Sequence, residues 1–116
     1  MPYSAEQLTF ANQSIAPVNL AGASTNNVIV TGVAGQRIVV LYGWLAAGTT
    51  ATSYLMEGSG GTALTGVIAL ATNSAHEFVP PPGILVMKCL AGESLRIDVG
   101  AGDLDGWLVY TMVQAQ

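Results

Sequence analysis

The residues of this chain that could support catalysis are His76, Glu77 and Cys89. A cysteine nucleophile needs a histidine base within hydrogen-bond reach and a third group that orients this base. The chain offers one histidine, and Cys89 stands in the mostly apolar run 85–90, which is typical of a buried structural cysteine. We therefore predict that the protein is not an enzyme. A small hydrolase that uses Cys89 and His76 is the competing hypothesis.

Metal and phosphate sites find little support either. Asp103 and Asp105 stand among glycines in 100–106, but an EF-hand loop needs a third early ligand and a later glutamate. The glycine-rich stretch 57–66 lacks the Gly-Lys-Ser/Thr ending of a phosphate-binding loop. We therefore expect no cofactor and no metal. Both stretches are interpreted as hairpin loops, and Asp105 and Gly106 are expected to form the turn of the first. A calcium ion at the two aspartates is the alternative.

The composition excludes several classes of partner. The 116 residues are 51% hydrophobic and 9% charged, with a net charge of −4, whereas soluble domains carry about 25% charged residues. Three cationic residues against seven acidic ones cannot form the basic surface that nucleic acid requires. The longest apolar run, 38–47, is shorter than the roughly 20 residues of a membrane-spanning helix. The first residues lack a signal-peptide pattern, so we expect synthesis in the cytoplasm.

High hydrophobicity with few charges predicts a surface that other protein covers. A monomer of this composition would expose large apolar patches, which usually mark interfaces or sites of aggregation. We therefore expect a homo-oligomer or a subunit of a larger assembly.

Glycine and proline occur so often that helices have little room. Only the windows 3–16 and 67–79 exceed ten residues without either of them. Strand-forming residues fill the shorter intervals. We predict strands near 26–31, 37–46, 51–57, 67–71, 76–79, 85–90, 94–99 and 107–113. Eight strands at this spacing indicate an all-β fold, an antiparallel β-sandwich or jelly roll.

The two ends of the chain differ in character. Residues 1–25 are polar with scattered apolar side chains. We interpret them as an extended N-terminal arm that reaches a neighbour, with a frayed terminus as the alternative. Residues 26–116 form the sandwich domain. Within it, the proline-rich stretch 79–83 is expected to be a stiff crossover between the two sheets.

Two predicted strands are apolar on both faces. In 95–99 apolar and charged residues alternate, whereas 38–45 and 107–113 show no such alternation. Only one face of a sandwich sheet meets the core, so the second apolar face is expected to meet another subunit. The alternative is that these are ordinary central core strands. Aromatic residues are enriched in interfaces, and the predicted interface residues are Leu8, Phe10, Tyr42, Trp44, Trp107 and Tyr110.

Three stretches resemble small bacteriophage virion proteins. They are 34–41, where a glycine turn and Arg37 precede an apolar strand; 53–66, a strand that runs into a glycine loop; and 91–99, followed by a loop and the strand that opens at Gly106. Together they span about residues 26–113. Proteins of this group are β-sandwich or jelly-roll units of head decoration (cement) layers or of tail and fibre assemblies.

The resemblance implies a capsid decoration protein of the virion. Such a protein would bind the phage head as an oligomer, a trimer, and would stabilise the shell through contacts with the major capsid protein or other virion proteins. The competing hypothesis is a tail or fibre module that recognises a host-surface glycan. In that role Tyr42, Trp44 or Trp107 would form an aromatic platform beside Asp103 and Asp105.

Overall fold

The computed structural model describes residues 13–79 and 87–114. Two of the predicted interface residues, Leu8 and Phe10, and the prolines of the expected crossover lie outside the described residues.

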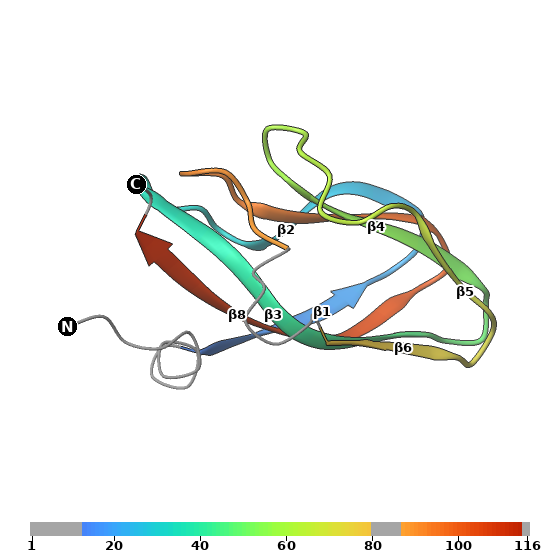
Figure 1. The fold of residues 1–116 in the computed structure, drawn as a ribbon. Helices are drawn as coiled ribbons and strands as arrows, with labels where there is room; N and C mark the ends of the chain where they lie inside the picture. The colour runs from blue at the N-terminus through green and yellow to red at the C-terminus, as the bar shows by residue number, and fades with distance from the viewer. Residues whose placement is uncertain (1–12, 80–86, 115–116) are drawn as a thin grey trace.

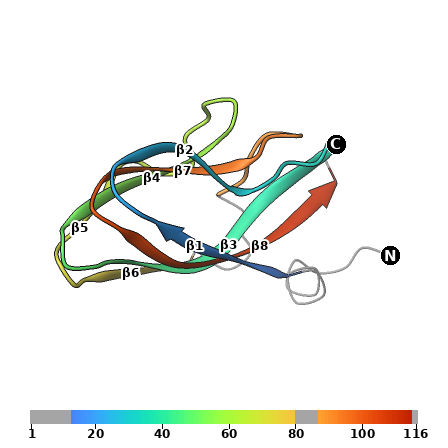
Figure 2. The ribbon, with the colours of Figure 1, turned by 180° about the vertical axis from the view of Figure 1, so that it is seen from behind.

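The described chain consists of eight strands and contains no helix. The strands are β1 (Ser14–Leu20), β2 (Ser24–Val30), β3 (Gln36–Ala47), β4 (Thr52–Gly58), β5 (Ile68–Leu70), β6 (Ala75–Phe78), β7 (Leu95–Ala101) and β8 (Leu104–Gln114). They form two antiparallel sheets, which lie one above the other in Figures 1 and 2. Sheet A has the order β1-β8-β3-β6, and sheet B has the order β2-β7-β4-β5. The predicted all-β sandwich is confirmed.

The strand order is that of a jelly roll. First and last strands pair with each other, and so do second and seventh, third and sixth, and fourth and fifth. A long hairpin that is rolled up on itself gives this pattern, with two Greek keys. The roll brings the two ends of the described chain together in sheet A, because β1 pairs along β8.

The core lies between the inner faces of the two sheets. Sheet A contributes Ile38, Leu45 and Leu108, and sheet B contributes Tyr54 and Met56, all of which are fully buried. The alternating burial of β4 and β7 shows that the two central strands of sheet B turn one face inward and one outward. Burial of these side chains is the main favourable term in the stability of such a sandwich.

The N-terminal boundary differs from the prediction. Strand β1 lies within the segment 1–25 that was expected to be an arm, and residues 14–25 belong to the sandwich instead. Pro17 within β1 suggested an arm, yet proline is tolerated here because β1 is an edge strand. The expected strand 85–90 is also wrong in its described part, since Lys88 forms only an isolated bridge to Val39.

One of the two expected hairpin loops is confirmed. The stretch 57–66 connects β4 and β5, which pair with each other. The stretch 100–106 instead crosses from sheet B to sheet A. Its turn contains Gly102 at a φ of 65°, while Asp105 and Gly106 lie within β8. Gly106 is therefore needed for a reason other than a turn.

Gly106 lets β8 approach β3 closely. Its φ is 149°, and a Cβ atom there would overlap the main-chain carbonyl oxygen of Trp44. We expect Gly106→Ala to lower the free energy of unfolding by about 2 kcal/mol or more, because strained backbone and overpacking add. The measurement is urea unfolding followed by circular dichroism. Gly48→Ala is the matched control, since its added Cβ meets nothing within 4 Å. Equal stability of the two variants would contradict the role of Gly106.

Candidate functional site

A β-bulge in β3 turns two aromatic residues to the outside of sheet A. The register of β3 against β8 shifts between Val40 and Tyr42, so that Leu41 is the extra residue. Before the bulge, Ile38 and Val40 face the core; after it, Leu45 and Ala47 do. A bulge changes which face successive side chains occupy. Tyr42 and Trp44 therefore lie on the outer face, and both are exposed.

These residues are part of a continuous apolar area that we call the aromatic surface. Its members lie on the outer face of sheet A, on β1, β8 and β3: Ile15, Pro17, Tyr42, Trp44 and Trp107. The register places Trp107 directly opposite both Pro17 and Trp44. Directly opposed residues share a face and contact each other. The two tryptophans are 37% and 38% exposed, so a partner can reach both at once.

Local contacts hold the aromatic surface in place. The rings of Tyr42 and Trp107 meet edge to face, with centroids 6.2 Å apart at 90°. The hydroxyl of Tyr42 donates a hydrogen bond to the Oε1 atom of Gln13 over 3.3 Å. Farther along the same face, Val39 and Thr111 are buried. The accessible part of this face is therefore the part around the two tryptophans.

The structure brings together three of the six predicted interface residues. Tyr42, Trp44 and Trp107 form the centre of the aromatic surface, whereas Tyr110 is partly buried on the inner side and packs against the core. Sequence reasoning missed Ile15 and Pro17, because β1 was not expected. Whether these residues bind a partner stays a prediction.

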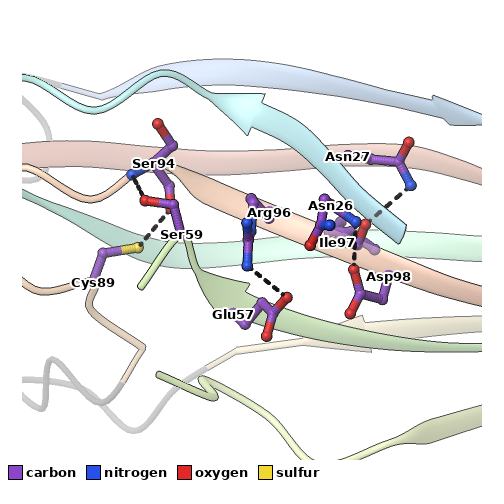
Figure 3. Close-up of polar contacts among 9 residues, drawn as sticks. All are labelled: Asn26, Asn27, Glu57, Ser59, Cys89, Ser94, Arg96, Ile97 and Asp98. Carbon is purple, nitrogen blue, oxygen red and sulfur yellow. Dashed lines mark hydrogen bonds and ion pairs between the residues drawn. The ribbon is translucent and has the colours of Figure 1, made fainter. Parts of the chain in front are cut away.

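The carboxylates on the outer face of sheet B have partners within the chain. On its outer face, Nη2 of Arg96 lies 3.1 Å from Oε1 of Glu57, and Oδ1 of Asp98 accepts a hydrogen bond from the main-chain N–H of Asn26 at 2.6 Å. Figure 3 shows both contacts side by side on this sheet. The carboxylates of Glu57 and Asp98 thus have partners within the chain, whereas Nε of Arg96 is buried without a hydrogen-bond partner among the described residues.

Sheet A differs, because two carboxylates flank its aromatic surface without such pairs. Glu77 of β6 lies opposite Trp44, and Asp105 of β8 is two residues before Trp107 and on the same face. Both side chains are exposed. Within the described part of the chain, neither makes a hydrogen bond or an ion pair. Asn19, opposite Asp105, adds an amide to this border.

The candidate catalytic residues do not come together. Cys89 donates its main-chain N–H to Ile38, while His76 lies opposite Leu45. Seven residues of β3 separate these two positions, or about 23 Å at the usual rise of a strand. The thiol of Cys89 is buried and donates a hydrogen bond to the carbonyl oxygen of Ser94 over 3.9 Å. This geometry offers no cysteine–histidine pair.

The two aspartates of the expected loop have different roles. Oδ1 of Asp103 accepts a hydrogen bond from the main-chain N–H of Gly22 at 3.1 Å, which ties the β1–β2 connection to the loop before β8. Asp105 belongs to the border of the aromatic surface. No cluster of three or more histidine, cysteine or acidic residues with metal-binding geometry occurs in 13–79 and 87–114. In these same ranges, no helix is long and apolar enough to cross a membrane.

Comparison with known proteins supports the fold. No family model matches the chain, and no curated protein matches it. A chain from Bacillus endospore appendages, which form disulfide-linked pili, is similar in structure with a TM-score of 0.54 and 15% identity, covering 90% of this chain and 88% of the other. At this identity the likeness shows the fold alone.

Two chains from virus structures match more weakly. One is from the virus-like particle of Macrobrachium rosenbergii extra small virus, with a TM-score of 0.38 and 10% identity over 90% of this chain and 80% of the other. The second is from infectious bursal disease virus, with a TM-score of 0.33 and 13% identity over 85% and 32%.

Burial of Cys89 predicts a loss of stability at alkaline pH. Desolvation, aided by the charge of Glu93 and opposed by that of Arg37, raises the pKa of the thiol from 9.0 to about 11. Between these values the unfolded chain has lost the proton that the folded chain keeps, so folding becomes less favourable as pH rises. We expect the free energy of unfolding, measured in urea, to fall from pH 9 to 11.

The control is Cys89→Ala, which removes the titrating group. The free energy of unfolding of this variant is expected to fall less over the same pH range. The loss that remains should begin at higher pH, because burial raises the pKa of Tyr54 from 10.0 to about 12. Identical pH profiles for the two proteins would contradict this assignment.

Proposed function

We propose that this chain is a non-enzymatic structural subunit that assembles with copies of itself through the aromatic surface of sheet A. The observation that carries the proposal is the pair Trp44 and Trp107, which lie directly opposite each other on the outer face of the central strands. Both remain exposed in a chain with few charges. Tryptophan and tyrosine are enriched among the residues that dominate binding energy at interfaces.

The sheet edges favour assembly through a face rather than by strand addition. Exposed edge strands are a risk for uncontrolled pairing, and proteins protect them with proline, bulges or short length. Here β1 contains Pro17, β2 has two register irregularities, and β5 and β6 are only three and four residues long. By contrast, the aromatic surface consists of exposed, uncharged residues of β1, β3 and β8 within the described part of the chain.

In its finer form, the proposal is a decoration protein of a bacteriophage head. This role comes from the resemblance of 34–41, 53–66 and 91–99 to small phage virion proteins. Subunits, as a trimer, would bind the major capsid protein and add binding free energy that holds the shell. The chain would then be located in the virion. A rigid sandwich with an apolar outer face suits such a role, because its function is to make contacts.

A second candidate is supported by the border of the aromatic surface. Asn19, Asp105 and Glu77 place hydrogen-bonding groups around two tryptophans. Aromatic faces can stack on the apolar side of a sugar ring, while carboxylates and amides pair with its hydroxyl groups. A glycan-binding module of a phage tail or fibre is therefore the alternative.

The assembly is tested by light scattering at low micromolar concentration. We expect the wild-type mass to equal several copies, and Trp44→Ser and Trp107→Ser to shift the mass toward one copy. Circular dichroism verifies that both variants stay folded, because each tryptophan also contacts its neighbours on the sheet and its loss costs some stability. Val67→Ser is the control, since Val67 is 73% exposed and precedes β5 of sheet B. A monomeric wild-type protein would overturn the proposal.

The two finer roles are separated by what the purified chain binds. For a decoration protein, we expect it to co-sediment with heads of the phage that encodes it and to raise the temperature at which they release DNA. For a glycan-binding module, we expect signals on a glycan array that Trp44→Ala abolishes while circular dichroism stays unchanged. Absence of head binding together with such array signals would reject the decoration role.

A further inference from the structure

We propose that Lys88 of a second copy occupies the aromatic surface and lies against Trp44, between Glu77 and Asp105. This inference rests on the proposed function and deepens it, because it names the contact through which the copies associate. The observation behind it is that some charged side chains of the described residues have partners within the chain and others have none.

Six of the seven acidic residues are described, and four of them have partners within the chain. Glu57 pairs with Arg96. The other three accept main-chain hydrogen bonds: Asp98 from Asn26, Asp103 from Gly22 and Glu93 from Leu90. Glu77 and Asp105 are the two described carboxylates that are left, and both border the aromatic surface. The open site therefore carries two negative charges that are suited to a cation.

The basic residues show the complementary pattern. Arg96 is used by Glu57, and Nε of Arg37 donates to the carbonyl oxygen of Cys89 at 3.0 Å. Lys88 is exposed, and no hydrogen bond or ion pair joins it to the described residues. Among the described residues, one free cation thus stands against two free anions.

Lys88 cannot reach these anions within its own chain. It bridges to Val39 of β3, whereas Glu77 lies opposite Trp44 on the same edge of that strand. Five residues of β3 separate the two positions, or about 16 Å at the usual strand rise. This is far more than a lysine side chain spans. The pairing must therefore form between copies.

The chemistry of the aromatic surface fits an ammonium group. Tryptophan is the best aromatic partner for a cation, and the attraction grows when water is removed. Glu77 opposite Trp44 supplies the opposite charge that a bound ammonium group needs, and Asp105 on the strand of Trp107 adds a second negative charge at the border of the site. Because the contact joins two different residues, it can form twice across a two-fold dimer or once per neighbour in a head-to-tail ring such as a trimer.

A charge exchange tests the contact. We expect Lys88→Glu and Glu77→Lys, each alone, to raise the dissociation constant of the oligomer about tenfold or more, because each opposes like charges. The double variant Lys88→Glu/Glu77→Lys restores the opposite charges and should return to within about threefold of wild type. The measurement is light scattering over a dilution series, in low salt and in 0.5 M NaCl, which should weaken the wild-type oligomer.

Two control variants account for net charge alone. Thr62→Lys and Thr62→Glu change the charge on the exposed loop between β4 and β5, and we expect no effect on the dissociation constant. Circular dichroism verifies that every variant is folded.

Three results would overturn the inference. They are unchanged association of either single variant, failure of the double variant to recover, and equal effects of the Thr62 variants. If Trp107→Ser dissociates the oligomer while Lys88→Glu does not, the assembly stands and the lysine contact is wrong. A monomeric wild-type protein would instead remove the proposed function itself.

Discussion

The pairing of β3 with β8 is the interaction on which the rest of the structure depends. These two longest strands run antiparallel from Gln36 opposite Gln114 to Ala47 opposite Leu104. Strand β1 adds to the other edge of β8, and β6 adds to the other edge of β3, so sheet A exists only because this pair does. Its inner face supplies a large part of the core, and its outer face supplies Trp44 and Trp107. The same pair of strands thus contributes to the stability of the fold and to the candidate site.

The bulge at Leu41 keeps these two roles apart. Side chains alternate along a strand, so a shift of one residue exchanges the two faces. Without the extra residue, the phase set by Ile38 and Val40 would turn Trp44 into the core and Leu45 out to solvent. The closeness of β3 and β8 at this point also explains Gly106, because any side chain there would meet the carbonyl of Trp44. The aromatic surface is therefore a property of the backbone as much as of the residue types.

Most of the fold could be predicted from spacing and composition, and the failures have physical causes. Strand β1 was missed because Pro17 and the polar residues around it are unusual in a strand, and only its edge position makes them acceptable. Asp105 and Gly106 have the sequence of a turn. The glycine is needed instead because β8 and β3, which are far apart in the chain, approach each other closely at this point. Tyr42 and Tyr110 are both residue types that are common in interfaces. The bulge places Tyr42 on the outer face of the sheet, whereas Tyr110 packs against the core. Such outcomes depend on register, which local sequence does not contain.

The same limit applies to the charges. In the sequence, Glu77 and Asp105 are no different from Glu57 and Asp98, because each stands in or beside an apolar strand. Only the register reveals that, among the described residues, the carboxylates of sheet B have partners within the chain, whereas sheet A places Glu77 opposite Trp44 and Asp105 on the strand of Trp107 without such partners. In a chain with so few ionic groups, this asymmetry distinguishes the outer faces of the two sheets. The protected edges disfavour strand addition, so the assembly that we propose runs through the outer face of sheet A and brings Lys88 of a second copy to these carboxylates.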